Sequence, residues 1–320
     1  MTGGELSPLA LGRSIAEARR RCGWTQPELA AMLGRPPAWV SRLERGLVPA
    51  EPGPVPGVAA RAPLTARPGD GTDADAGRPE AARVLRLVLA GGGSRAGDRI
   101  LAGYSRAALD QVAARVWAVA GAGRYGDLAE LLADLLPELE AALRVAPEQR
   151  RAALCQLMSV SYQACSAALA SLGDHDSALT AAGRAMTAAH RAGDVLGTAA
   201  CGYLQACVLL EARRNAEADL IARAAADAMQ LPAAGGSMEA LALRGALTLL
   251  RALIAVRAGD LAAAEDQLGR ARVMAGRLSH PADSRRVGGG FGPDQVALYE
   301  MVIRIEAAAI PAARAGGTGQ

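Results

Sequence analysis

The sequence has 320 residues, which is long enough for two domains. Aromatic residues make up only 3% and include a single Phe, whereas Ala and Leu are frequent, so we expect helices packed through small side chains rather than a sheet core. The formal net charge is +3, and residues 1–50 hold seven Arg and four Glu, so the whole positive excess lies in this segment. A local excess of positive charge favours a polyanion as the partner of this segment.

The cysteines and the apolar runs disfavour several classes of protein. An odd number of cysteines without a CxxC pair does not suggest a disulfide framework. The N-terminus lacks the basic and apolar regions of a signal peptide, and Arg, Glu or Gly interrupts each apolar run before it reaches the length of a membrane span. We therefore expect a cytoplasmic protein without a membrane partner and with reduced, mostly buried thiols at Cys22, Cys155, Cys165, Cys201 and Cys207.

Residues 22–46 have the pattern of two short amphipathic helices around a tight turn. Thr25 is a suitable N-cap, and Glu28 follows three residues later as its capping-box partner. Pro27 lies in the first turn, where no intrahelical N–H bond is lost, and Gly34 suits the left-handed backbone at the end of a helix. These residues predict the first helix of the pair.

The second helix is expected to restart at Pro36 or Pro37 and to end at Gly46. It would bury Val40 and Leu43 and turn the remaining side chains outward: Ala38, Ser41, Arg42 and Arg45. A helix, a Gly-containing turn and a second helix with polar and basic residues outward form the helix-turn-helix arrangement. A plain buried helical hairpin is the alternative.

The segment Leu11–Gly46, LGRSIAEARRRCGWTQPELAAMLGRPPAWVSRLERG, resembles the helix-turn-helix of the Xre class of bacterial repressors, which is related to phage repressors and Cro. The resemblance implies a lambda-repressor-like DNA-binding domain, which we expect over residues 9–48. It also implies that an Arg of the preceding helix pairs with the Glu of the ERG motif, which aligns with Arg19 and Glu44. This pair would be a structural brace rather than a DNA contact.

The docking geometry of this motif suggests the DNA contacts. The N-terminus of the first helix of the pair should face a phosphate, with Gln26 and backbone N–H groups as donors. Arg42 is the best candidate for a bidentate contact with guanine. Readout should be sparse, because Pro37 and Ala38 cannot hydrogen-bond a base through their side chains. The full expected set is Thr25 and Gln26 at a phosphate, Arg42 with support from Ser41 and Arg35 at bases, Ala38 or Trp39 at thymine methyls, and Arg45 at the DNA backbone.

The composition changes sharply after the helix-turn-helix. Seven Pro and five Gly fall within residues 49–79, with almost no periodic apolar residues. We expect a disordered Pro/Gly-rich linker over 49–78, because such a segment cannot bury enough apolar surface to order itself. In the resembling family the domain continues directly into two more short helices, which residues 79–102 could supply here.

The run 84–98 ends in a cluster of glycines and invites comparison with a strand followed by a phosphate-binding loop. Its GxGxxxG spacing departs from GxGxxG, the sequence has no Walker lysine, and no βαβ pattern follows. A helix that ends in glycines is favoured, and no cofactor is expected.

From residue 105 onward the sequence predicts a succession of helices separated by Gly-Asp steps, in which Gly supplies the C-terminal turn of one helix and Asp caps the next. The steps are Gly126-Asp127, Gly173-Asp174, Gly193-Asp194 and Gly259-Asp260. The expected helices span 105–122, 127–145, 148–172, 176–191, 194–213, 216–230, 237–258, 260–279 and 294–309. Helix pairs that recur roughly every 40 to 47 residues indicate an α-solenoid that resembles tetratricopeptide (TPR) repeats but has a longer period.

This part of the chain is also similar to the repeat domain of actinobacterial Xre-type regulators. The similarity lies in ARVWAVAGAGRYGDLAELLADLLPELEAAL, AGDLAAAEDQLGRARVMAGRL and FGPDQVALYEMV. We expect the TPR-like domain over 105–310 and a disordered tail over 311–320, without the further helices that follow FGP in that family.

The grooves of repeat proteins hold extended or helical peptides. Six residues are candidates for such an effector groove, although helix packing is favoured for any single one of them: Tyr162, Gln163, His190, Tyr203, Gln205 and Arg213. No metal site is expected, because His175, His190 and His280 lie far apart and no carboxylate cluster joins them. No catalytic triad can be argued from spacing, so an enzyme is not expected.

These patterns together predict an all-α transcriptional regulator. Its helix-turn-helix would bind double-stranded DNA as part of a homodimer, because two-fold related half-sites give this motif its affinity. Its TPR-like solenoid would bind a peptide or protein effector or mediate dimerisation, and the resemblance implies a signalling peptide. The alternative is a TPR-like protein-interaction scaffold whose helix-turn-helix no longer reads DNA specifically.

Overall fold

The computed structural model describes residues 8–21, 23–33, 35–47, 78–91, 103–229, 236–278 and 291–316. The elements of secondary structure in these ranges are all α-helices, as expected. They are α1 (Pro8–Arg21), α2 (Gln26–Met32), α3 (Pro37–Glu44), α4 (Arg78–Leu89), α5 (Arg106–Gly121), α6 (Tyr125–Val145), α7 (Glu148–Ser171), α8 (His175–Arg191), α9 (Val195–Glu211), α10 (Asn215–Ala228), α11 (Met238–Arg257), α12 (Leu261–Ala275) and α13 (Pro293–Gly316).

Three of the four Gly-Asp steps separate helices in the predicted way. Gly173 has φ +85°, and the Asp174 side chain that follows accepts a hydrogen bond from the Ser177 N–H at 3.2 Å. Asp194 and Asp260 cap α9 and α12 in the same way. A left-handed glycine followed directly by an aspartate cap therefore ends one helix and begins the next.

The prediction for Gly126-Asp127 is wrong. Because α6 already begins at Tyr125, both residues lie in its first turn. Gly123, with φ +68°, makes the turn instead, and Asp127 pairs with Arg124 at 3.0 Å.

The last helix extends further than expected. The sequence predicts its end near residue 309 and a disordered tail from 311, but α13 continues to Gly316. Residues 307–309 are three consecutive Ala, which has the highest helix propensity, and the helix continues past them and through Pro311. The rest of the expected tail, residues 317–320, lies outside the described residues.

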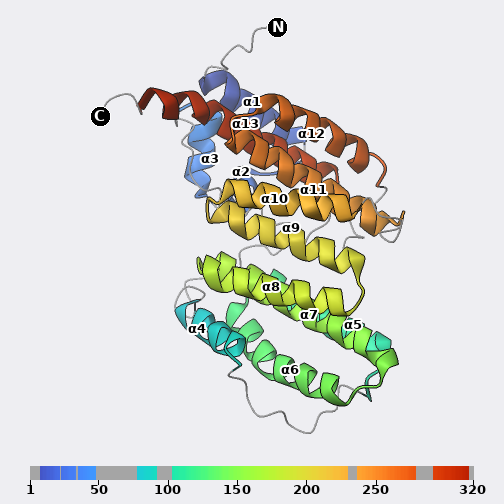
Figure 1. The fold of residues 1–320 in the computed structure, drawn as a ribbon. Helices are drawn as coiled ribbons and strands as arrows, with labels where there is room; N and C mark the ends of the chain where they lie inside the picture. The colour runs from blue at the N-terminus through green and yellow to red at the C-terminus, as the bar shows by residue number, and fades with distance from the viewer. Residues whose placement is uncertain are drawn as a thin grey trace.

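Helices α5 to α13 form a TPR-like α-solenoid (Figure 1). Each helix packs against the next in the chain, and α5, α7, α9, α11 and α13 also pack against one another in that order. Both α7 and α9 are buried around most of their circumference, as is typical of helices enclosed by neighbours. By contrast, α8 buries a stripe of alanines and exposes its polar face.

Helix α4 belongs to this solenoid in space. It packs against α6, α7 and α8, and Arg86 pairs with Asp174 at 2.9 Å. The possibility that residues 79–102 complete the N-terminal domain is therefore wrong for the described part of that segment. The reason is its buried stripe of Leu85, Val88 and Leu89, which joins the core formed with α5–α8. Almost all of the expected linker, residues 49–77, lies outside the described residues.

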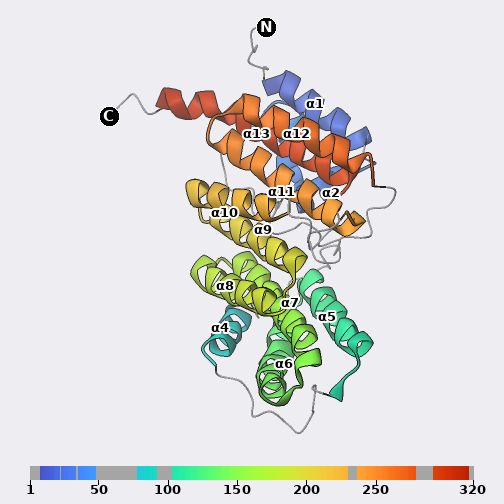
Figure 2. The same cartoon turned by 45° about the vertical axis from the view of Figure 1, so that its right-hand side comes forward.

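Helices α1–α3, which we call the N-terminal domain, lie at the opposite end of the molecule from α4 (Figures 1 and 2). There α1 contacts α13. The N-terminal domain shares one continuous cluster of buried apolar side chains with α9–α13, whereas a second cluster joins α4–α8 with part of α9. The chain therefore places its first helix against its last one.

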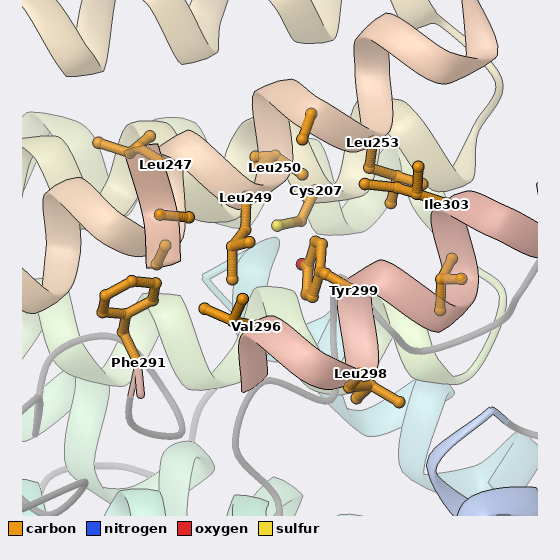
Figure 3. Packing of buried hydrophobic residues seen from close by; sticks show 14 of the residues in the cluster. Cys207, Leu247, Leu249, Leu250, Leu253, Phe291, Val296, Leu298, Tyr299 and Ile303 are labelled. Carbon is orange, nitrogen blue, oxygen red and sulfur yellow. The ribbon is translucent and has the colours of Figure 1, made fainter. Parts of the chain in front are cut away.

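Figure 3 shows the centre of the first cluster, where α11 and α13 meet. Tyr299 is buried beside the Cys207 thiol, and Phe291 covers Gly245 on α11. A Cβ atom at Gly245 would lie 2.1 Å from the Phe291 ring, so this approach requires glycine. The glycine lets the single Phe of the sequence fill the space beside α11.

Candidate nucleic-acid interface

The N-terminus of α2 is fixed by a capping box. The Thr25 N–H donates to the Glu28 carboxylate at 2.7 Å, and the Glu28 N–H donates to the Thr25 hydroxyl at 3.3 Å. Pro27 occupies the first turn, where its missing N–H costs nothing. The local sequence therefore sets where α2 begins, as predicted.

Helix α3 is anchored by one face and exposed on the other. Val40 and Leu43 are fully buried, whereas Ala38 and Arg42 are exposed. The helix ends at Glu44, and Gly46 follows with a φ of +69°, which allows the next N–H, that of Leu47, to reach the Arg42 carbonyl at 2.9 Å. This arrangement projects the outward residues from a rigid element.

The expected brace pair meets in a bidentate ion pair. Arg19 Nε donates to Glu44 Oε1 at 2.6 Å, and the Arg19 guanidinium also donates to Glu44 Oε2 at 3.0 Å. A third donation runs from Arg19 to the Trp24 carbonyl at 2.6 Å. Burial opposes ionisation of Glu44, but hydrogen bonds from Arg19 and Gln26 outweigh it and lower the pKa of the carboxyl.

Two features of this region have no counterpart in the sequence prediction. Gln26 Nε2 donates to Glu44 Oε2 at 2.7 Å, so the amide expected at a phosphate is bonded inside the protein. Gly12 lies against the end of α3, where a Cβ atom would be 2.4 Å from the Leu43 carbonyl oxygen. The Gln26 bond and the Gly12 contact both depend on how the helices pack together. Only the Gly12 contact has a signal in the sequence, because a Gly within a helical pattern indicates that another backbone approaches closely.

The tryptophans and arginines around α3 are partly occupied by contacts within the domain. The Arg35 guanidinium lies over the Trp39 ring at 5.2 Å, and both residues are half-buried. Arg45 Nε donates to the Ser41 carbonyl at 3.1 Å. Trp24 and Trp39 pack against the apolar cluster, so each ring contributes to the core.

The six candidate groove residues do not share one surface. Tyr162, Gln163 and Tyr203 are at most 5% exposed, so their assignment to an open groove is wrong. Gln163 Nε2 donates to the Ser159 hydroxyl at 3.2 Å, and burial is the main cause of the raised pKa of Tyr203. The close stacking of α7–α9 and α13 encloses these side chains. The other three remain accessible to different degrees, Gln205 half-buried and His190 and Arg213 exposed.

The described thiols are buried and protonated. Burial raises the pKa of Cys165 to about 12 and of Cys201 to about 11, which keeps both thiols neutral near pH 7. Within the described ranges no three His, Cys, Asp or Glu side chains are grouped to hold a metal ion. Nor does any described helix combine the length and apolar character required to cross a bilayer.

A family model described as a helix-turn-helix domain matches residues 10–61. No curated protein matches the chain. Among solved structures, the crystal structure of Bacillus thuringiensis PlcR in complex with the peptide PapR7 and DNA is similar, with 16% sequence identity, coverage of 82% of this chain and 93% of that chain, and a TM-score of 0.35. A helix-turn-helix domain therefore occupies the N-terminal region of this chain.

Proposed function

We propose that this chain is a DNA-binding transcription regulator, in which α3 enters the major groove of double-stranded DNA. The observation that carries the proposal is the outward face of α3, where Arg42 is exposed on a helix held by the buried Val40 and Leu43. An arginine that projects from a rigid helix can pair with the O6 and N7 atoms of guanine. Arg42 is therefore the residue to which we assign direct base readout.

The other outward residues have smaller proposed roles. Ala38 is exposed and offers a methyl group to thymine, and Ser41 is half-buried beside it on the helix. Arg45 is exposed, and its side chain is held by a hydrogen bond to the backbone of its own helix. We assign it to a contact with a DNA phosphate. The cation–π contact between Arg35 and Trp39 favours a role for both in supporting the residues that read the bases.

We further propose that the protein acts as a homodimer of Xre-type architecture, because paired half-sites multiply the affinity of a single helix-turn-helix. The TPR-like solenoid would bind a peptide or protein effector or hold the dimer together. The candidates that remain for an effector contact are His190 and Arg213, which are exposed, and Gln205, which is half-buried. Light scattering of the purified protein should give twice the mass of one chain, and a monomer with and without DNA would contradict this part of the proposal.

Selection from random duplex DNA tests the function directly. Wild-type protein should enrich a palindrome, and Arg42→Ala should weaken binding to it by about 1–3 kcal/mol for each half-site, because the dimer loses one direct base contact in each. Arg115→Ala removes an equally exposed arginine from α5 and should bind as the wild type does. No enrichment, or binding that depends on salt and is equal in all three proteins, would contradict specific readout.

A protein-interaction scaffold is the second candidate function. Pro37 and Ala38 are exposed at the start of α3 and carry no side-chain atom that could hydrogen-bond a base. A selection without enrichment would favour this function, and capture of partners on the solenoid would then replace DNA as the measurement.

A further inference from the structure

The carboxylate of Glu44 joins all three helices of the N-terminal domain. It receives two donations from Arg19 on α1 and one from Gln26 on α2, while it lies itself at the end of α3. Only 7% of the Glu44 side chain is exposed. The expected brace between Arg19 and Glu44 therefore has a third member, which is the residue assigned to the phosphate contact.

The N-terminus of α2 offers few backbone donors to a phosphate. Pro27 has no N–H, and the Glu28 N–H is already bonded to the Thr25 hydroxyl. The Glu28 carboxylate at this end carries a negative charge of its own. A phosphate that approaches α2 must therefore rely mainly on the donors of Gln26.

The contact with Glu44 restricts how the Gln26 carboxamide can be placed. An ionised carboxylate only accepts hydrogen bonds, so it selects the amide nitrogen over the amide oxygen. The amide nitrogen carries two N–H groups, and the bond to Glu44 at 2.7 Å uses one of them. Gln26 is half-buried, so part of the residue is open to solvent.

From this geometry we infer that Glu44 is a positioning residue for DNA binding, which holds the Gln26 carboxamide so that its second N–H faces a DNA phosphate. This inference rests on the proposed function. A side chain that is already ordered loses less rotamer entropy when it binds, so the contact with Glu44 strengthens the phosphate contact without touching DNA. A brace that only stabilised the fold would leave the affinity of Gln26 for DNA unchanged.

A double-mutant cycle separates positioning from simple stabilisation. The full-length wild type, Gln26→Ala, Glu44→Gln and the double variant are titrated with the duplex enriched in the selection. We expect Gln26→Ala to weaken binding about 3- to 10-fold for each half-site, which corresponds to the loss of one hydrogen bond in each. Glu44→Gln should weaken it by a similar or smaller factor, and the double variant should match Gln26→Ala within about 2-fold.

Two controls keep the result unambiguous. Thermal unfolding of each variant shows whether it is folded at the temperature of the titration. Arg19→Lys weakens the brace but leaves the bond between Gln26 and Glu44, so it should lower the melting temperature with little change in affinity. The salt dependence of binding should be the same for wild type and Gln26→Ala, because no charge is removed.

The outcomes distinguish this inference from the proposed function. If wild type binds no duplex, both fail. If wild type binds but the effects of Gln26→Ala and Glu44→Gln multiply in the double variant, Glu44 does not act through Gln26 and only this inference is overturned. The same holds if Arg19→Lys weakens binding as much as Glu44→Gln does.

Discussion

Two interfaces in the same solenoid join their helices by opposite means. Between α7 and α8 the contact consists of small side chains, with Ala178, Ala181 and Ala185 fully buried. Hydroxyl groups on α7 reach the α8 backbone, as in the 2.8 Å donation from Ser166 to the Ala178 carbonyl. Between α11 and α13 the contact consists of large side chains around Tyr299 (Figure 3).

The second interface also contains a nearly buried ion pair. Arg257 on α11 donates to both oxygens of Glu306 on α13, at 2.7 to 3.1 Å, and also to the Leu210 carbonyl at the end of α9. Only 17% of the Arg257 side chain and 10% of the Glu306 side chain are exposed. Small residues between α7 and α8 therefore allow hydrogen bonds from hydroxyl groups to backbone carbonyls. Between α11 and α13 the side chains are bulky, and the charge pair among them needs a hydrogen-bond partner for each of its polar atoms.

The comparison predicts that the α11–α13 interface is most sensitive to truncation of its charge pair. Glu306→Ala should lower the free energy of unfolding by about 3–5 kcal/mol, because it leaves Arg257 uncompensated in a mostly buried site. Urea unfolding measures this change. Glu300→Ala on the same helix removes the partner of Arg272, which is 53% exposed, and should cost less than about 1 kcal/mol. Equal effects of the two variants would contradict the assigned role of the buried pair.

The α7–α8 interface should instead be sensitive to added volume. Ala181→Leu should destabilise the protein by about 1–3 kcal/mol, because the extra carbons have no space between closely packed helices. Ala224→Leu places the same side chain at an exposed position of α10 and serves as the control. If both variants unfold at the wild-type urea concentration, α7 and α8 are not packed as closely as described.

Removal of a single hydroxyl at this interface should have a smaller effect. Ser166→Ala should cost about 1 kcal/mol, the net value of one buried hydrogen bond. Thr187→Ala removes a hydroxyl that bonds the Gly183 carbonyl on the exposed side of α8, and its stability should stay close to that of wild type. A shift of the thermal midpoint for Thr187→Ala but not for Ser166→Ala would reverse this expectation.

The buried thiols should have no effect at neutral pH and a growing one in alkali. Burial raises the pKa of Cys165 to about 12 and of Cys201 to about 11, from an ordinary value of 9.0. Above pH 9 the unfolded chain has therefore lost protons that the folded chain still holds. Stability should be constant up to about pH 8 and should fall as pH rises through 9 toward 11.

Urea midpoints measured between pH 7 and pH 10 test this dependence. The Cys165→Ala, Cys201→Ala double variant should show a shallower decline above pH 9 than wild type, because two of the groups responsible have been removed. A midpoint that does not move between pH 8 and pH 10 would mean that the thiols ionise equally in the folded and unfolded chains.

Local residues alone determined most of the helix boundaries. Eight of the nine helices expected after residue 105 begin and end within four residues of the structure, and the capping box of Thr25 and Glu28 is present. These features depend on residues three or four positions apart, whose effect on the backbone is the same in most contexts. The error at Gly126 arose because two nearby glycines can each end a helix, and the local pattern does not choose between them.

The pairing of Arg19 with Glu44 was available from the family resemblance, whereas the bond from Gln26 was not. The pair is separated by 25 residues, so no local periodicity reveals it. The hydrogen bond from Gln26 to Glu44 depends on how α2 and α3 pack together. A side-chain amide can bond many neighbours, and the sequence does not indicate which one.

Only the tertiary structure decided which elements belong together. It placed α4 on α6–α8 rather than on the N-terminal domain, and it set α1 against α13. It also enclosed Tyr162 and Tyr203, which the sequence left as candidates for a groove. The physical reason is that the sequence of an amphipathic helix shows which of its faces is apolar but not which other helix that face will pack against. The partner depends on shape and volume across the whole core.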